Sequence, residues 1–587
     1  MRAPLVGLMV LATTLAQEPN PADWYSKYPH YPDYCSIPSA MENRQIPPLP
    51  SDGQWGESRL KHVSVIIRHG ARTPTRPDLT CWSGYHDAPE TSVWNCNLTT
   101  WMVLPTPFDG SSASPAFFEK HYDGLMHTSL ANELNGTCQR GQLLWQGYDQ
   151  EMTNGKHLRD AYVYNSKNYD HDTRLRLLDT HSPLTPHLYF RVDDDQRTVM
   201  SGQVLLQGML GSDLTANLPL HIADRDNDIM DPNEYVCPRL REMRERFERS
   251  QQYQQYMNSK EVVTLRAFMK DVLGINGDMD AIDCLMTAMC TDRPIPDSID
   301  DFDPDWQARR LQNFTEDHVE GNTTGAFVDE PVTTPVVDYG NHLFQRLFQF
   351  DSDMWTMVYS ADNAAYAKLG MAWLWADILK HIRGFFYETE DPSIKKFALY
   401  SGHDTTIMPI LVSLGPDVWD HKWAPYASMI VIELHEINID GHADKDIFQS
   451  NFAFRLIYNG QVLTHLMDGC PNDSELCDAQ VFLTTVGEFA TPTPECRRRF
   501  PIPTVYEDTV SRAREFFATP GGIVALLMLV AASATVGALG SFFCLTGGLS
   551  RKRHRRSQVP TDEHDGLTIE NGDYENGYTD NPTFTID

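Results

Sequence analysis

The sequence predicts an α/β fold in which helices flank a mixed, mostly parallel sheet, with an inserted helical cap and one C-terminal transmembrane helix. Three short apolar runs, 63–67, 188–192 and 397–400, predict strands of this sheet, and each ends at a loop with charged side chains. Segments with helical spacing lie between the runs and fit flanking helices. The 587 residues exceed one typical domain, so we expect a large core with insertions.

The N-terminus has the features of a secretory signal. A basic residue precedes the apolar run 5–11, which is too short to span a bilayer, and small residues at 14–16 offer a cleavage point. We therefore predict a signal peptide at residues 1–16. Residues 17–57 are rich in proline and tyrosine, and we expect them to form an irregular arm on the domain surface.

A turn with two guanidiniums and an imidazole follows the first apolar run; it reads Arg68-His69-Gly70-Ala71-Arg72-Thr73-Pro74. Arginine is always charged, and its planar fork of donors matches phosphate oxygens. A histidine between arginines is pushed toward its neutral form, because like charges lower its pKa. A neutral imidazole can attack phosphorus at acidic pH. The turn therefore predicts a phosphate-handling site at the carboxyl end of a strand.

The segment 79–139 differs in composition from its surroundings. It is rich in tryptophan, glycine, serine and cysteine, and we expect a disulfide-rich insertion that lies near the first motif and narrows its entrance. Residues 141–162 return to helical spacing. The region from about 211 to 390 is mostly helical in pattern, with an acidic, proline-bearing break at 292–305, and is predicted to form the inserted cap.

The second and third apolar runs also end at charged loops. The run 188–192 leads to Arg197 and a helical pattern, and the run 397–400 leads to Ser401-Gly402-His403-Asp404 and another helical pattern. Further strands are expected at 429–434 and 452–458, the latter turning at Asn459-Gly460. The three loops together supply a set of candidate site residues: Arg68, His69, Arg72, Arg197, His403 and Asp404.

The C-terminal part of the chain predicts a membrane anchor. Residues 521–545 are uncharged, largely apolar and long enough to span a bilayer, and a basic run follows at 551–556. Positive residues stay cytoplasmic, so the expected topology is a type I single-pass protein with a lumenal or extracellular catalytic domain. Residues 501–520 are predicted as a stalk and 546–587 as a disordered cytoplasmic tail that could bind sorting adaptors.

Cysteine and sequon usage agrees with an oxidising compartment. Ten of the 11 cysteines lie between the signal and the span, an even number that suits disulfides. Cys284 with Cys290 and Cys470 with Cys477 are close enough in sequence to be candidate pairs. A zinc site is the alternative, but no paired short Cys-x-x-Cys spacing occurs. Five sequons predict glycosylation, at Asn97, Asn135, Asn313, Asn322 and Asn472.

The formal net charge of −32 speaks against a nucleic-acid partner, because an acidic protein without a large basic patch repels a phosphate backbone. A small phosphate ester remains compatible, since an arginine-lined pocket dominates its own local field. The oligomeric state stays open, a homodimer included.

The chain resembles the histidine acid phosphatase family, the acid phosphatase and phytase branch of the histidine phosphatase superfamily, and in particular its membrane-anchored, lysosomal-type members. The resemblance covers about residues 58–500. It is carried by the turn at 68–74 and by His403-Asp404. Three further segments match family patterns: Gly147, Gln150, Gly155, Leu158 and Arg159; 197–201; and Ala424-Pro425-Tyr426-Ala427-Ser428.

The resemblance implies a histidine phosphatase fold and a role for each site residue. His69 would be the nucleophile that forms a phosphohistidine, and Asp404 would protonate the leaving alcohol. The phosphoryl oxygens would be held by Arg68, Arg72, Arg197 and His403. The implied reaction is the hydrolysis of small phosphomonoesters with an acidic optimum and with neither metal nor cofactor, in a lysosome, an endosome or at the plasma membrane.

One departure from the family pattern and two rival functions remain. Gln196 stands where relatives usually carry Asp before the central arginine, which puts the support of Arg197 in question. Adjacent acids at 193–195 are interpreted as a polar loop rather than a cation site, and His62, His435 and His421 as structural or solvated. The phosphoglycerate mutase branch fits poorly because its members are soluble. The alternatives are a receptor or adhesion protein that keeps the fold without catalysis, or a phosphatase specialised for a glycan, lipid or inositol phosphate.

Overall fold

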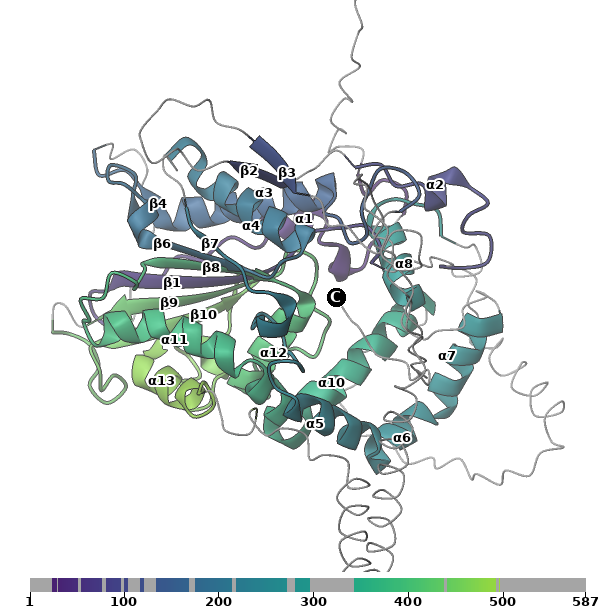
Figure 1. Cartoon of the computed structure of the whole chain (residues 1–587). Coiled ribbons are helices and arrows are strands. Elements are labelled where there is room, and N and C mark those ends of the chain that lie inside the picture. The colour runs from purple at the N-terminus through teal and green to yellow at the C-terminus, as the bar shows by residue number, and fades with distance from the viewer. Residues whose placement is uncertain are drawn as a thin grey trace, which may run out of the picture. The chain divides into compact units, whose positions relative to one another are not determined.

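The structure is a computed structural model of the chain (Figure 1). It describes residues 24–28, 30–50, 54–75, 81–96, 100–103, 117–120, 134–167, 175–213, 218–271, 280–295, 343–437, 441–491 and 496. The chain divides into two units, and the first, residues 1–497, holds every described residue. The predicted signal peptide, stalk, span and tail lie outside the described residues. No helix within the described ranges is long and apolar enough to cross a membrane.

A mixed sheet organises the fold (Figure 1). Its strands follow the order β11 (Gln461–Val462), β10 (Phe452–Tyr458), β9 (Met429–Glu436), β1 (Arg59–Arg68), β8 (Phe397–Gly402), β6 (Leu188–Val192) and β7 (Leu220–His221), with β12 (Cys477–Asp478) beside β10. The half from β1 to β7 is parallel, whereas β9, β10, β11 and β12 pair antiparallel. The sheet is therefore mixed as predicted, but among the described strands it is not mostly parallel.

The parallel half brings the three motifs to one edge of the sheet. Arg68 at the end of β1 is in register with Gly402 of β8, and Ser401 is in register with Val192 at the end of β6. The predicted strands at all three apolar runs are confirmed. Because parallel strands end at the same edge, the loops that follow them converge there.

Helices cover both faces of this sheet (Figure 1). On one face lie α3 (Trp145–Tyr162) and α4 (Gln196–Leu210), and on the other lie α11 (Ala372–Phe386), α12 (Asp404–Leu414) and α13 (Ala479–Gly487). Alternate residues of β1 serve the two cores, since Val65 packs with the α3 and α4 side and Ile66 with the α11 and α12 side. Burial on both faces explains why the first apolar run is continuous.

Further helices carry the segment predicted as a cap. They are α5 (Arg239–Glu248), α6 (Gln251–Met257), α7 (Lys260–Asp271), α8 (Asp280–Cys290) and α10 (Leu343–Gly370). The backbone of α10 leaves the helical conformation at 361–364. This helix packs against α12, α5, α8 and α11, so it links the cap helices to the helix that follows the third motif.

Short elements complete the described chain. They are α1 (Pro38–Glu42), α2 (Pro89–Ser92), the hairpin of β2 (Thr100–Val103) and β3 (Phe117–Lys120), and the parallel pair of β4 (Val163–Tyr164) and β5 (Leu178–Asp179). One-turn 3₁₀ helices lie at Asp33–Cys35, Thr185–His187, Gly211–Asp213, Arg225–Asn227 and Thr464–Leu466.

Five disulfides join the ten cysteines between residues 35 and 496: Cys35–Cys290, Cys81–Cys284, Cys96–Cys138, Cys237–Cys496 and Cys470–Cys477. The predicted pair Cys470–Cys477 is confirmed. The pair Cys284–Cys290 is wrong, because both residues lie on α8. Six residues of helix separate their Cα atoms by about 9 Å along the axis, which exceeds the reach of a disulfide. The disulfides place this unit in an oxidising, secreted or lumenal compartment.

Candidate active site

The first motif is fixed by backbone pairing and by a close approach of α3. His69 donates its backbone N–H to the carbonyl of Gly402 (3.0 Å), which joins the first motif to the third. A Cβ on Gly70 would lie 2.5 Å from the backbone of Gly147, and one on Gly147 would lie 2.3 Å from the carbonyl oxygen of Ala71. Only glycine at both positions lets the turn and the start of α3 meet, and this supports the role of these glycines in the family patterns.

His69 presents a neutral, unoccupied ring nitrogen. Its side chain is fully buried, and Nδ1 donates to the carbonyl of Gly70 (2.8 Å), so the proton resides on Nδ1. Nε2 has no hydrogen-bond partner among the described residues. Burial, followed by the charges of Arg68 and Arg197 and then by those of Arg72 and His403, holds the pKa of His69 well below its ordinary value. The ring therefore has a free electron pair at acidic pH.

Arg68 is fully buried, and both of its terminal nitrogens have protein partners. One terminal nitrogen donates to the carbonyl of Ala424 (2.6 Å), and the other donates to the Tyr34 hydroxyl (2.7 Å) and pairs with Asp404 (2.8 Å). The guanidinium packs against the rings of Tyr34 and Tyr426, 4.6 and 4.5 Å from their centroids, and the two rings also contact each other. Arg68 thus acts on the site as a fixed positive charge that also holds Asp404.

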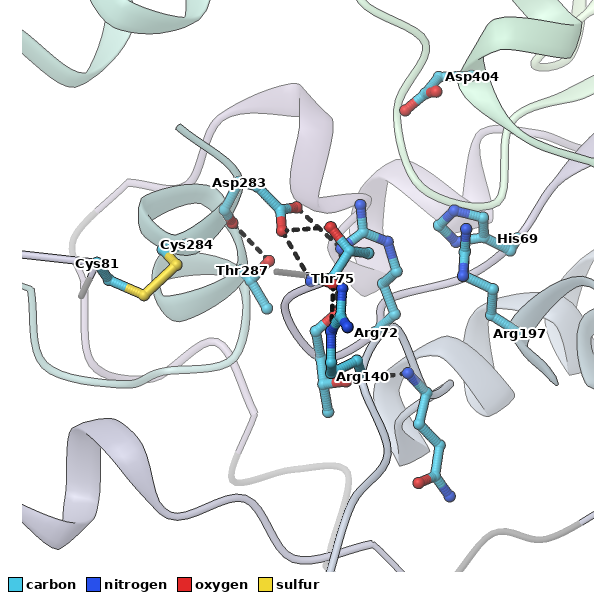
Figure 2. A network of polar contacts seen from close by, with 12 residues as sticks. His69, Arg72, Thr75, Cys81, Arg140, Arg197, Asp283, Cys284, Thr287 and Asp404 are labelled. Atoms are coloured by element: carbon cyan, nitrogen blue, oxygen red, sulfur yellow. Dashed lines mark hydrogen bonds and ion pairs between the residues drawn. A yellow bond between two sulfur atoms is a disulfide. The ribbon is translucent and has the colours of Figure 1, made fainter. Parts of the chain in front are cut away.

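Arg72 and Arg197 lie close to His69 in Figure 2. Nη1 of Arg72 donates to Asp283 on α8 (2.9 Å), and Nη2 of Arg197 pairs with Asp195 (3.0 Å). Both arginines are about 95% buried. Two oriented guanidiniums beside an imidazole nitrogen without a hydrogen-bond partner among the described residues suit an anion such as a phosphoryl group.

His403 carries a positive charge at the start of α12. Its Nε2 contacts the carboxylates of Asp193 and Asp195, the second at 3.3 Å. Burial and Arg197 oppose the charge, but Asp193 and Asp195 together outweigh them and raise the pKa of His403 to about 10. Nδ1 meets no acceptor among the described residues, which leaves this N–H available to an anion. The rings of His403 and His69 are 5.4 Å apart.

Asp404 is held by three donors. Its Oδ2 accepts from the indole of Trp423 (2.8 Å) and pairs with Arg68, and its Oδ1 accepts from the backbone N–H of Thr405 (2.8 Å). The side chain is buried, and Figure 2 shows it set apart from Arg72 and Arg197. A carboxyl fixed there can give a proton to the leaving oxygen of a bound phosphate ester without contacting the oxygens that the arginines hold.

The structure brings all six predicted site residues together, and it adds partners that the sequence did not identify. The acids at 193–195 are more than a polar loop, because Asp193 and Asp195 hold His403 and Arg197. Their position beside the central arginine was the available signal. Asp283 carried no signal, since a helical segment more than 200 residues from Arg72 gives no hint of contact. Gln196 accepts instead from the N–H of Leu143 (2.9 Å), so Asp195 supplies the carboxylate for Arg197.

Asp193, Asp195 and His403 also have the composition of a metal-ligand set. The same two carboxylates raise the pKa of His403 to about 10, and a protonated imidazole donates hydrogen bonds to them. The trio is better described as an ion-paired support for a cationic histidine.

Known proteins give an independent comparison. The model of a family described as the histidine phosphatase superfamily (branch 2) matches residues 59–459. Counting factor 60 of Dictyostelium discoideum is 24% identical over 474 residues, covering 78% of this chain and 91% of that protein. Lysophosphatidic acid phosphatase type 6 of Homo sapiens is 25% identical over 453 residues, covering 76% and 87%. Hafnia alvei phytase in complex with myo-inositol hexakis sulphate aligns with a TM-score of 0.39 and 14% identity, covering 75% of this chain and 98% of that one.

The family match begins at β1, ends just beyond β10 and includes every residue of the cluster around His69. Relatives whose alignments cover about three quarters of this chain are named phosphatases. This chain therefore belongs to the histidine phosphatase superfamily, branch 2, and is a phosphomonoester hydrolase.

Proposed function

We propose that His69, Arg68, Arg72, Arg197, His403 and Asp404 form the catalytic centre of an acid phosphatase. Nε2 of His69 attacks the phosphorus, the bond to the ester oxygen breaks, and the leaving alcohol takes a proton from Asp404. Water then attacks the phosphohistidine, giving a proton to Asp404, and inorganic phosphate leaves. The protons and the phosphoryl group balance over one turnover.

The free Nε2 of His69 is the observation that carries the proposal. A buried nitrogen without a partner among the described residues is costly, and it is retained here beside several positive charges. Those charges suppress protonation of the ring and attract a phosphate dianion into the same space. His62, in contrast, pairs both of its ring nitrogens, with Lys395 and Ser64.

The roles of the cations follow from their contacts. Arg72, Arg197 and the Nδ1–H of His403 supply donors for the phosphoryl oxygens, and Arg68 supplies charge while orienting Asp404. Asp404 must carry a proton to serve the leaving group, and this requirement favours an acidic optimum.

The domain plan and location belong to the same proposal. We place the catalytic domain at residues 58–500 and the insertion at 79–139, before the stalk and span of a type I anchor. The cap, expected at about 211–390, is narrowed to the helices from α5 to α10, because β7 belongs to the sheet and α11 covers it. Asn135 and Asn472 are exposed, as glycosylation requires, whereas Asn97, Asn313 and Asn322 lie outside the described residues. An acidic optimum suits a lysosomal or endosomal lumen, with the plasma membrane as the second location.

The test is hydrolysis of p-nitrophenyl phosphate by the full chain from pH 3 to 8, with and without chelator. We expect chelator-resistant, acid-optimal turnover that falls at least about 10³-fold in His69→Ala, as expected for loss of a nucleophile. His221→Ala, at an exposed histidine on β7, is the matched control. Folded protein without turnover at any pH would contradict the proposal. A panel of lysophosphatidate, phosphoxylose and inositol phosphates would then rank the alcohols.

A further inference from the structure

Asp283 reaches the catalytic centre from the cap. It lies on α8, and its Oδ1 accepts from Nη1 of Arg72 (2.9 Å), while its Oδ2 accepts from the backbone N–H and the hydroxyl of Thr75 (3.0 and 3.1 Å). In Figure 2, Asp283 lies on one side of Arg72 and His69 on the other. One cap carboxylate thus fixes both the side chain and the backbone that follow the first motif.

Arg72 meets Asp283 through one nitrogen of its guanidinium. A guanidinium has five N–H donors, and the contact with Asp283 uses one nitrogen, which also donates to the carbonyl of Thr73 (3.1 Å). Burial would raise the pKa of Asp283, but Arg72 and the hydrogen bonds of Thr75 hold it below its ordinary value. The carboxylate therefore stays ionised in the acidic range and continues to orient the arginine.

Two disulfides join the helix that carries Asp283 to other parts of the chain. Cys284, the next residue, is joined to Cys81 in the insertion, and Cys290, the last residue of α8, is joined to Cys35. Figure 2 shows the Cys81–Cys284 disulfide beside the Asp283 network.

The insertion also contacts the chain that follows α8, through Arg293. Arg293 donates to the carbonyls of Glu90, Thr91 and Val93 (3.1, 3.0 and 2.8 Å), and its guanidinium lies 3.4 Å from the ring centroid of Trp94. The contacts come from two segments about 200 residues apart in the sequence. They make the insertion and α8 one supporting body for Arg72.

We propose that Asp283 is a positioning residue for Arg72 and that the Cys81–Cys284 disulfide holds it in place, so that the insertion and cap set phosphate affinity. The inference rests on the proposed function, since it takes Arg72 as a phosphate ligand. It assigns a task in the reaction to two segments that carry none of the six catalytic residues.

The sign of one measurement separates positioning from simple electrostatics. Asp283→Asn removes a negative charge 2.9 Å from Arg72 while keeping the shape of the side chain. If Asp283 only competes with phosphate for Arg72, the variant binds inorganic phosphate more tightly. If it positions Arg72, binding weakens by about tenfold or more, as for loss of a hydrogen bond between charged groups.

Calorimetry of the full chain with inorganic phosphate at pH 5 measures this binding without turnover. We expect Asp283→Asn also to raise KM for p-nitrophenyl phosphate more than it lowers kcat. Thr75→Val removes one hydrogen-bond donor to Asp283. It should also weaken phosphate binding and raise KM, but each by less than Asp283→Asn does. Unchanged or tighter phosphate binding in Asp283→Asn overturns the proposal. A wild-type protein that binds phosphate without hydrolysing esters would instead count against the proposed function alone.

A mutant cycle tests the part assigned to the disulfide. The double variant Cys81→Ser with Cys284→Ser is combined with Asp283→Asn, and Cys96→Ser with Cys138→Ser removes a second disulfide of the insertion as the matched control. If the disulfide acts through Asp283, the combined variant binds phosphate no more weakly than Asp283→Asn within about twofold. Multiplying losses, or an equal loss in the control, contradict it. Thermal unfolding of each variant checks that it is folded. If a disulfide variant does not fold, phosphate binding by Asp283→Asn alone decides whether Asp283 positions Arg72.

Discussion

His69 and His403 are neighbours whose pKa values move in opposite directions. Burial and four nearby positive groups lower that of His69, whereas Asp193 and Asp195 together overcome burial and raise that of His403 to about 10. The pair thus combines a neutral nucleophile with a cationic ligand at one pH. The neutral state of His69 could be predicted from its arginine neighbours in sequence. The charge of His403 could not, because its carboxylate partners lie some 210 residues earlier in the chain.

Asp193→Asn should therefore lower the pKa of His403 and weaken phosphate binding near neutral pH. Without the carboxylate, burial and Arg197 act unopposed except by Asp195, and the ring loses its proton as pH rises through a lower value. We expect about tenfold weaker phosphate binding at pH 7.5 and a much smaller change at pH 5.

Histidine NMR titration and calorimetry across pH measure the two effects of this substitution. Asp194→Asn is the control, because Asp194 is exposed and pairs with Lys120 instead. Equal loss of phosphate affinity at both pH values would show that Asp193 acts by packing and not by charge.

Asp351 on α10 is a buried carboxyl whose Oδ1 has no partner among the described residues. Burial, then the charges of Asp404 and Asp283, raise its pKa well above the ordinary value. In the unfolded chain it ionises near pH 4, so above that pH the folded state keeps a proton that the unfolded state releases. The folded state therefore loses stability from this group as pH rises.

Asp351→Asn should remove the loss of folding stability that the buried carboxyl causes as pH rises. We expect its free energy of unfolding in urea to fall less steeply between pH 4 and pH 7 than that of the wild type. Asp446→Asn, at an exposed carboxyl, should keep the wild-type slope. Identical slopes for Asp351→Asn and the wild type would mean that Asp351 ionises normally in the folded protein.

At the scale of elements, the site depends on how strand ends and helix starts meet. The sequence predicted the three strands and the helices after them because a strand buried on both faces is a continuous apolar run that ends at a polar loop. The partners of α8 and α10 are long-range contacts without a local pattern. The direction of β9 and β10 also escaped prediction, since apolar runs do not specify parallel or antiparallel pairing.

Gly147→Ala should disturb the meeting of the first motif with α3. Its Cβ would lie 2.3 Å from the carbonyl oxygen of Ala71, and backbone can give way only if the turn moves. We expect the free energy of unfolding to fall by about 1–3 kcal/mol and kcat/KM to fall with it. Gly487→Ala in α13 is the control, because its Cβ would meet only the flexible end of Arg383. Wild-type activity and stability in Gly147→Ala would contradict the close approach.

At the scale of the whole molecule, a centre shared by distant segments explains the disulfides and the cap. Four of the five disulfides bridge more than 40 residues, and two of them fix α8 beside Arg72. The compartment could be predicted from the even number of cysteines, but three-dimensional proximity decides the pairing. Six catalytic candidates came from the sequence because their motifs are local, whereas their supports, such as Asp193 and Asp283, act across the fold.

The central claim is that His69 carries the phosphoryl group, and trapping the intermediate tests it most directly. The full chain is mixed with a ³²P-labelled phosphomonoester at pH 5, quenched in base within milliseconds and digested. We predict label on the peptide with His69, stable in base, lost in acid and absent from His69→Ala. Label on a carboxylate or a hydroxyl, or steady turnover with no covalent label at any quench time, would contradict the account.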